Sequence, residues 1–362
     1  MVRLAALAHH KLQDIRDLSF EEFSAYLASI GEKPFRAGQV FEWLYKKDAA
    51  AFEDMTTLSQ PLRNRLKNDL AFAPAVIADQ QRSEDGTAKF LFELSDGEHV
   101  EAVLIPTAVR TTACISTQVG CKFGCRFCAS GVAGWKRNLS TAEIMTQVLY
   151  VKHAAGKKRP LTHIVFMGIG EPMDNYDVLL KSIHLINSDK AVNIAARRIT
   201  VSTSGVVPKI LKLAQQDLQI ELAISLHGYD NPSRDVLMPV NKKYPIEKLM
   251  EACRAYGASK RRQITFEYIL IKGVTVTPEA PAALQKLFKG LLCKMNLIPY
   301  NPVAEYPHQC PGHAEMLAFR SELEKAGIHA TIRTPRGKDV NAACGQLRHA
   351  HQSGQTNFDK NV

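Results

Sequence analysis

The sequence predicts an α/β protein, in which a partial (open) β/α barrel of about six units follows an N-terminal helical accessory domain. Two observations lead to this fold class. Apolar residues recur at helical spacing over residues 19–70, whereas strand-like runs alternate with helical runs from Thr111 onward. About six such units fall short of the usual eight of a closed barrel, so an open barrel is the economical interpretation.

The first helices are predicted from their caps. Ser19 and Glu22 fit a capping box, after which apolar residues follow at helical spacing. A second helix is expected over 36–46, and a third after Ser59, with Pro61 in its first turn. The lysines and arginines of these helices are compatible with RNA contacts, and a solvated helix surface explains them equally well.

A β-hairpin is predicted after these helices. Residues 88–94 and 98–105 alternate in hydrophobicity on either side of Asp96-Gly97, a dipeptide typical of tight hairpin turns. We expect the hairpin to bridge the two domains.

The remainder of the chain has a βαβ pattern. Strands are expected at 111–117, 161–166, 197–202, 219–225, 263–271, 293–298 and 328–333. Helices are expected at 140–154, 176–188, 206–216, 246–259, 279–290 and 312–326. The predicted organisation is therefore a helical accessory domain (1–86), a bridging hairpin (87–106), the partial barrel (107–347) and a polar tail (348–362).

Composition narrows the class of partner and compartment. A formal net charge of +10 and a pI near 9.1 favour a polyanionic partner such as nucleic acid, although a basic balance can also reflect only a solvated surface. Eight cysteines in a chain of 362 residues, without a secretory leader, do not resemble a disulfide scaffold. Reduced thiols predict a cytoplasmic protein, and no run of residues is apolar enough to predict a membrane span.

Three cysteines form the most informative motif. Cys121, Cys125 and Cys128 are separated by three and then two residues, and Gly124 permits a tight turn between them. Three thiolates without a nearby fourth suit a 4Fe-4S cluster with one open iron, because structural zinc normally takes four ligands. A zinc site completed by a histidine remains the alternative. The spacing resembles the signature of the radical S-adenosylmethionine (SAM) superfamily, in which the open iron binds and reductively cleaves SAM.

Small and polar residues stand where the predicted parallel strands end, which is where β/α proteins place their chemistry. They are Gly170-Glu171-Pro172, Ser202, Ser225-Leu226-His227 and Asn301. Each alone is weak evidence, since a Gly-x-Gly is usually a turn and a single histidine is more often part of a core. Together, beside a cysteine loop, they predict a site that could hold SAM by hydrogen bonds.

Three further segments resemble one family within that superfamily. Cys114 to Cys121 (CISTQVGC), the Gly-Glu-Pro at 170–172, and Ala342 to Leu347 (AACGQL) are similar to the RlmN and Cfr family of radical-SAM RNA methyltransferases. Pro172 and the run 334–337 (TPRG) resemble the RlmN branch more than the Cfr branch. Gly228 departs from the pattern, because alanine is common there.

The resemblance implies roles for individual residues. It places a methyl-carrying cysteine at Cys344, its partner thiol at Cys114 and a candidate base at Glu101. It implies SAM contacts at Gly170, Glu171, Ser202, Ser225, Leu226, His227 and Asn301. Without it, Cys114 would be interpreted as a buried strand residue and Glu101 as a hairpin carboxylate.

The resemblance also implies a reaction and its partners. The expected activity is methylation of adenosine at carbon 2 in large-subunit ribosomal RNA and in tRNA, with two SAM molecules per turnover and a disulfide formed at the end. An electron donor such as flavodoxin or ferredoxin and a monomeric state are expected. The alternatives are a Cfr-like carbon-8 methyltransferase, a radical-SAM enzyme with another substrate, and a zinc-stabilised RNA-binding module.

Overall fold

The computed structural model describes residues 12–132, 134–302 and 306–334 of the chain. Cys344 and the predicted tail lie outside these residues. The three predicted N-terminal helices are confirmed, as α1 (Phe20–Ser29), α2 (Phe35–Tyr45) and α3 (Gln60–Asp69). The capping box is present: Ser19 Oγ accepts the Glu22 N–H at 3.1 Å, and Glu22 Oε2 accepts the Ser19 N–H at 2.7 Å.

A ten-stranded sheet forms the centre of the molecule, in the order β1-β2-β3-β4-β7-β8-β9-β10-β11-β12. The first three strands are antiparallel to their neighbours, and parallel pairing runs from β4 to β12. The strands are β1 (Val76–Arg82), β2 (Ala88–Glu93), β3 (His99–Pro106), β4 (Thr111–Cys114), β7 (His163–Phe166), β8 (Ile199–Thr203), β9 (Glu221–Ser225), β10 (Ile264–Leu270), β11 (Cys293–Pro299) and β12 (Ala330–Ile332). The hairpin and every parallel strand stand where the sequence predicts them.

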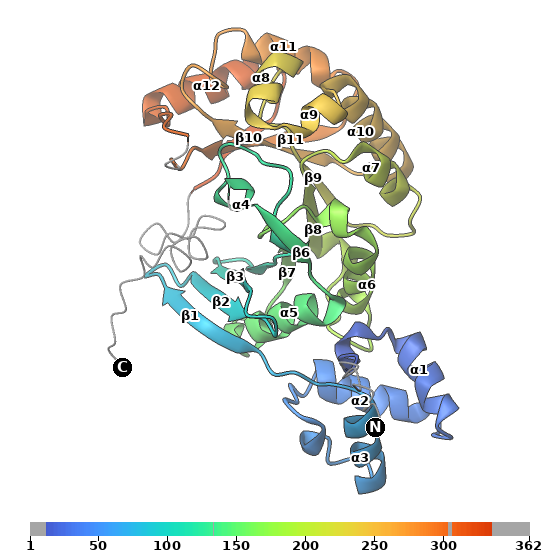
Figure 1. Cartoon of the computed structure of the whole chain (residues 1–362). Helices are drawn as coiled ribbons and strands as arrows, with labels where there is room; N and C mark the ends of the chain where they lie inside the picture. Colours follow the sequence, from blue (N-terminus) through green and yellow to red (C-terminus); the bar gives the residue numbers. More distant parts are fainter. Residues whose placement is uncertain (1–11, 133, 303–305, 335–362) are drawn as a thin grey trace, which may run out of the picture.

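The predicted helices connect the parallel strands. They are α5 (Thr141–Ala155), α6 (Tyr176–Asn187), α7 (Val207–Ala214), α10 (Ile246–Lys260), α11 (Ala280–Phe288) and α12 (His313–Lys325). Figure 1 shows them arranged along the outside of the sheet, with the N-terminal helices beside α5 and α6. Asp17 joins the two parts, because its carboxylate accepts the Ala142 N–H at the start of α5 at 2.7 Å and its carbonyl oxygen accepts from Lys181 of α6 at 2.8 Å.

The two faces of the sheet differ in chemistry. One face, here called the apolar face, packs beneath the helices, and its side chains are at most 1% exposed: Phe90, Ala102, Ala113, Ile164, Val201, Leu222, Phe266 and Met295. Strand register places the alternate residues on the opposite face. This second face, here called the polar face, carries Lys89, Glu101, Cys114, Ser202, Ser225, Glu267 and Asn296. Hydrophobic burial therefore holds the helices to one side and leaves the other for chemistry.

The sheet is open. Among the described residues, β1 pairs only with β2 and β12 only with β11, so the sheet keeps two edges and does not close into a barrel. The α/β class with a mostly parallel sheet is confirmed.

Several elements were not predicted. β1 lies within the segment expected to be helical. It was not predicted, because this edge strand is half-exposed and its sequence (VIADQQR) lacks the alternation that reveals a buried strand. The other unpredicted elements are short: β5 (Gln118–Gly120), β6 (Trp135–Asn138), α4 (Ala129–Val132), α8 (Asn231–Leu237), α9 (Val240–Lys243), and the 3-10 turns η1 (Ile15–Asp17), η2 (Phe52–Asp54), η3 (Pro172–Asn175) and η4 (Ala196–Arg198). Within the described part of the chain, no helix has the length and apolarity that crossing a bilayer requires.

Candidate active site

The cysteine loop follows β4 and β5 and lies beside the ends of the parallel strands. Cys128 N–H donates to the Cys125 carbonyl at 3.1 Å, and α4 begins at the next residue. Gly131 of α4 approaches so closely that a Cβ there would lie 2.9 Å from the Cys125 nitrogen. The loop is therefore folded tightly on itself, with Cys121, Cys125 and Cys128 half-buried.

The chemistry of these thiols fits a cationic iron centre. Burial raises the pKa of Cys121 to about 12. Burial also raises the pKa of Cys125 well above its ordinary value, as do the charges of Cys128 and Cys121 when those thiols ionise. Burial and mutual repulsion thus oppose the ionisation of all three thiols, and a bound cationic centre would offset the charge of the thiolates.

The arrangement of donors bears on the type of centre. Among the described residues, no three His, Cys, Asp or Glu side chains lie close enough together to hold a single metal ion. A cluster makes a different demand, because each thiolate binds a separate iron and the thiols need only face a common volume. Cys121, Cys125 and Cys128 would hold such a cluster.

Glu171 ties the ends of two strands together. It follows β7, is 4% exposed, and accepts the N–H of Ser204, beyond β8, at 2.7 Å and that of Met173 at 3.1 Å. Its own N–H donates to Gln118 Oε1 at 2.8 Å. Burial raises the pKa of Glu171, and the hydrogen bonds that its carboxylate accepts from Ser204 and Met173 partly oppose that rise. A carboxylate can accept further hydrogen bonds, so Glu171 keeps capacity for a ligand.

Arg234 of α8 continues this chain of contacts, although no motif in the sequence points to it. Its guanidinium is completely buried and donates to the carbonyl oxygens of Ser204, Ser225 and Leu226. Among the described residues, no carboxylate lies within ion-pair distance of it. Burial lowers the pKa of Arg234 to about 10, and ionised Cys125 opposes that effect more than Asp235 does. Arg234 is therefore a buried cation that holds strand ends in place beside the cysteine loop.

The structure explains the glycine at position 228. A Cβ on this residue would lie 2.9 Å from the backbone nitrogen and Cα of Arg234, so glycine allows α8 to approach the end of β9. An alanine at this position would require α8 to shift.

His227 is buried beside the cysteine loop. Its ring lies edge-on to Phe127, with centroids 4.8 Å apart, and its Nδ1 accepts the Ile269 N–H at 3.1 Å. Burial, together with the nearby charge of Arg234, lowers the pKa of His227 to about 3. The imidazole is therefore neutral at pH 7, and its remaining proton is on Nε2, from which it can be donated to a ligand.

Cys114 and Glu101 share the polar face of the sheet. Cys114 lies opposite Val103 in the β3–β4 pair, and Glu101 is two residues from Val103, so both side chains point to one side. They are 6% and 3% exposed. Glu101 Oε2 pairs with Lys89 Nζ at 3.2 Å, a fully buried ion pair. Residues from two neighbouring strands thus share one surface.

Four further predicted site residues lie at or just after the ends of parallel strands. Ser202 and Ser225 are half-exposed on the polar face, Leu226 is buried and donates to the Glu267 carbonyl at 3.0 Å, and Asn301 is exposed after β11. No disulfide joins two described cysteines. Cys344 lies outside the described residues.

Comparison with known proteins identifies the family. Residues 115–280 match the model of the radical SAM superfamily, and residues 13–71 match that of the ribosomal RNA large subunit methyltransferase N-terminal domain. The chain is 45% identical over 341 residues to "Probable dual-specificity RNA methyltransferase RlmN" from Lachnospira eligens, covering 94% of this chain and 97% of that one. The chain belongs to the RlmN family of radical SAM RNA methyltransferases.

Further comparisons agree with this membership. The protein of the same name from Geobacillus kaustophilus is 46% identical over 346 residues, with 95% of each chain covered. A crystal structure of a radical SAM methyltransferase from Sphaerobacter thermophilus superposes with a TM-score of 0.89 at 42% identity, covering 92% of this chain and 98% of that one. The fold of a radical SAM methyltransferase therefore extends over nearly the whole chain.

Two arginines outside the N-terminal helices are engaged in ion pairs. Arg137 pairs with Asp96 at 2.6 Å and Glu143 at 2.9 Å, and Arg262 pairs with Glu221. The exposed residues 157–159 and 197–198 precede β7 and β8, so they lie at the amino ends of these strands, opposite the cysteine loop. Lys242 and Lys243 of α9 are exposed and follow β9, on the side of the site. Of these basic residues, Lys242 and Lys243 are thus the ones on the side of the site in this RlmN-family protein.

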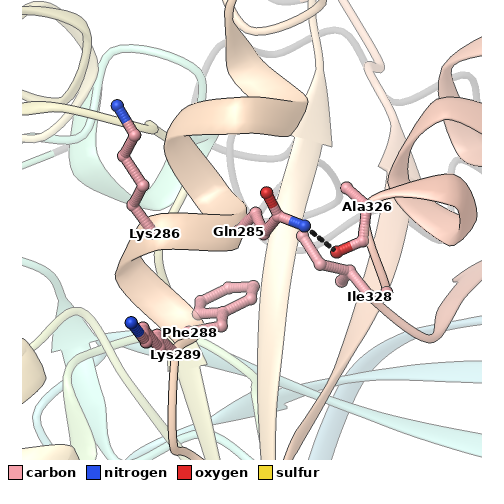
Figure 2. Close-up of a pocket in the computed structure, with 7 residues that line it drawn as sticks. Gln285, Lys286, Phe288, Lys289, Ala326 and Ile328 are labelled. Atoms are coloured by element: carbon pink, nitrogen blue, oxygen red, sulfur yellow. Dashed lines mark hydrogen bonds between the residues drawn. The ribbon is translucent and has the colours of Figure 1, made fainter.

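A hollow of about 520 Å³ elsewhere on the surface has no part in the site. Figure 2 shows its lining by Gln285, Lys286, Phe288, Lys289, Ala326 and Ile328, with Gln285 Nε2 donating to the Ala326 carbonyl at 2.9 Å. These residues come from the end of α11 and from the connection that leads into β12. The hollow is therefore at the amino ends of the strands, away from the cysteine loop at their carboxyl ends.

Gly170 offers a test of how tightly the site is built. Its φ is +104°, and a Cβ would lie 2.6 Å from Gln118 Cβ and 2.9 Å from the Gln118 nitrogen. We expect Gly170→Ala to lower the free energy of unfolding by about 2–4 kcal/mol, since backbone strain and overpacking add. Urea denaturation measures this.

The matched control is Gly97→Ala in the hairpin turn. Gly97 has a φ of +79°, and a Cβ added there would have nothing within 4 Å, so only backbone strain of about 1–2 kcal/mol is expected. Equal losses in the two variants would show that the turn after β7 is not closely packed against Gln118.

Proposed function

We propose that this RlmN-family enzyme methylates carbon 2 of an adenosine in large-subunit ribosomal RNA and in tRNA. The observation that carries the proposal is the shared surface: Cys114 and Glu101 lie together on the polar face, and the cysteine loop follows directly after β4 and β5. The dual specificity in the names of its relatives supports two RNA substrates. Carbon 2 of adenine is electron-poor, so a radical route suits it better than direct attack on the methyl group of SAM.

Cys121, Cys125 and Cys128 would hold a 4Fe-4S cluster. When bound, the cluster supplies the electron that cleaves SAM to a 5′-deoxyadenosyl radical, and a donor such as flavodoxin or ferredoxin restores that electron. The groups proposed to hold SAM come from the strand ends: Gly170, Glu171, Ser202, Ser225, Leu226, His227 and Asn301. Neutral His227 can donate from Nε2, and Arg234 fixes the main chain of Ser225 and Leu226 in place.

Two cysteines of the chain would carry the methyl group and release the product. Cys344 thiolate would attack the methyl carbon of a first SAM, so that the methyl group moves to the cysteine sulfur and S-adenosylhomocysteine leaves. The 5′-deoxyadenosyl radical from a second SAM would take a hydrogen atom from the methyl group on Cys344 and become 5′-deoxyadenosine. The resulting methylene radical would then bond to carbon 2 of adenine. Glu101 would accept the ring proton, and the one electron that leaves the adduct would go to the oxidised cluster or to the oxidised electron donor. Cys114 thiolate then attacks Cys344 sulfur, so the carbon–sulfur bond breaks, the released carbon takes a proton, and a disulfide remains for cellular thiols to reduce.

Each segment of the chain would have its own role in binding or catalysis. We assign residues 1–86 to an accessory unit for RNA, 87–106 to a bridge, 107–347 to a catalytic partial barrel of about six units, and 348–362 to a tail. Exposed lysines such as Lys242 and Lys243 would contact phosphates, while the target adenosine leaves its stack to reach the polar face. We expect a cytoplasmic monomer.

The deciding experiment combines metal analysis with product analysis. Anaerobically reconstituted protein is expected to hold about four irons and four sulfides per chain. With SAM, a reductant and ribosomal RNA or tRNA, nuclease digestion and mass spectrometry should reveal 2-methyladenosine. Stoichiometric zinc without sulfide would contradict the radical reaction, and 8-methyladenosine would assign the enzyme to Cfr-like chemistry.

A further inference from the structure

Glu267 is a buried carboxylate that the reaction above does not use. It lies in the middle of β10, a strand whose seven residues are all buried, and is 5% exposed. In the strand register it faces Ser225 of β9 on one side and Asn296 of β11 on the other. It therefore belongs to the polar face, next to the end of β9 where SAM contacts are proposed.

Only one of the two Glu267 carboxylate oxygens has a hydrogen-bond partner among the described residues. Oε1 accepts from Asn296 Nδ2 at 3.0 Å, and Asn296 Oδ1 in turn accepts from Thr331 Oγ1 at 2.9 Å. Oε2 is buried and makes no hydrogen bond within the described part of the chain. Native proteins rarely leave a buried carboxylate oxygen without a donor, because such an atom loses its hydration and gains nothing in return. The missing donor is therefore expected to come from a bound molecule.

The surroundings indicate which kind of donor fits. Ser225 and Asn296, on either side of Glu267, are half-exposed, so the polar face beside the carboxylate is accessible. Burial raises the pKa of Glu267, and the charges of Arg333 and Lys294 oppose that rise. Since Arg333 and Lys294 already offset part of this charge, a further cationic donor is not required. A neutral hydroxyl can satisfy the remaining oxygen.

We propose that Glu267 Oε2 accepts a hydrogen bond from a ribose hydroxyl of a nucleoside bound on the polar face. Carboxylates recognise ribose hydroxyls in this way in dinucleotide-binding proteins, where an acidic residue near the strand ends accepts from them. The inference rests on the proposed function for its choice of ligand, since SAM and the adenosine of RNA both carry a ribose. The shared chemistry is the sugar hydroxyl, and the experiment separates its two sources.

The test is a thermodynamic cycle on the full chain, reconstituted anaerobically, with Glu267→Gln. Glutamine can keep the bond from Asn296 through its carbonyl oxygen, but it then turns an N–H donor toward the ligand where a carboxylate oxygen had stood. One pair of probes is S-adenosylhomocysteine and its 2′,3′-dideoxy analogue. The other pair is an RNA hairpin with adenosine or 2′-deoxyadenosine at the target position. Equilibrium dialysis gives each dissociation constant.

The proposal predicts coupling between the residue and the hydroxyls. Glu267→Gln should weaken binding of the hydroxyl-bearing probe about tenfold and leave its hydroxyl-free analogue unchanged, as expected for loss of one charge-assisted hydrogen bond. Coupling in the first pair assigns the ribose to SAM, and coupling in the second assigns it to RNA. Effects that are equal for both members of each pair would overturn the proposal.

Two controls keep the outcome interpretable. Glu221→Gln alters another polar-face carboxylate, one that pairs with Arg262 at the start of β9, and should change none of the dissociation constants. Thermal unfolding of Glu267→Gln shows whether the variant is folded. Wild-type protein that binds neither kind of probe would contradict the proposed function, whereas wild-type binding without coupling would contradict only the role of Glu267.

Discussion

Replacing Cys344 with alanine is expected to abolish both methylated RNA and any protein–RNA adduct, because the variant lacks the sulfur that carries the methyl group. Cys114→Ala should behave differently. Methyl transfer, radical formation and addition to adenine can proceed, but no thiol is present to break the link, so RNA should accumulate covalently attached through Cys344. Denaturing gels with labelled RNA, followed by mass spectrometry of the adduct, distinguish the two variants.

Burial of Cys114 requires a control for simple loss of packing. Cys253 of α10 is also buried, at 0% exposure, and burial raises its pKa to about 12. Cys253→Ala should cost stability as any truncation in a core does, yet give normal turnover and no adduct. If Cys114→Ala released methylated RNA at the wild-type rate, Cys114 would have only a packing role.

Lys89→Met should lower the free energy of unfolding by about 3–5 kcal/mol, the largest stability effect we expect from a single polar substitution here. Lys89 and Glu101 form a buried ion pair, with side chains 0% and 3% exposed and a separation of 3.2 Å. Removing the cation takes from the buried Glu101 carboxylate the ion pair that Lys89 supplies. Urea denaturation of the purified variant, compared with wild type, measures the loss.

A double variant and an exposed pair complete this experiment. Lys89→Met combined with Glu101→Leu should recover most of the loss, because neither charge is then buried alone. Lys67 pairs with Glu53 at 2.5 Å on the surface, with side chains 64% and 57% exposed, and Lys67→Met should have no measurable effect. If Lys89→Met were as harmless as Lys67→Met, the buried Lys89–Glu101 ion pair would not contribute to the stability of the protein.

Most of the architecture could be predicted from local patterns. The parallel strands and the helices between them carry strong periodicity, because each must bury one side against a neighbour. The capping boxes at Ser19 and Ser140 fix where two helices begin. The cysteine loop was recognisable because its chemistry depends on spacing along the chain.

What escaped prediction depends on contacts across the chain. Arg234 acts on carbonyl oxygens that are contributed by β9 and by the turn after β8, and no spacing in the sequence reveals such a partner. Glu267 did leave a signal, since a carboxylate in the apolar run Ile264 to Leu270 is out of place unless it binds something. The surface shared by Cys114 and Glu101 follows from strand register, which only pairing defines.

The contrast between the two faces of the sheet also bears on how such an enzyme could change over generations. Neighbouring residues along one strand serve separate purposes, since Phe266 packs under the helices while Glu267 points to the opposite side. A substitution at one of these positions alters folding, and a substitution at the next alters recognition. New substrates could therefore be acquired through alternate residues of the strands while the scaffold is inherited intact.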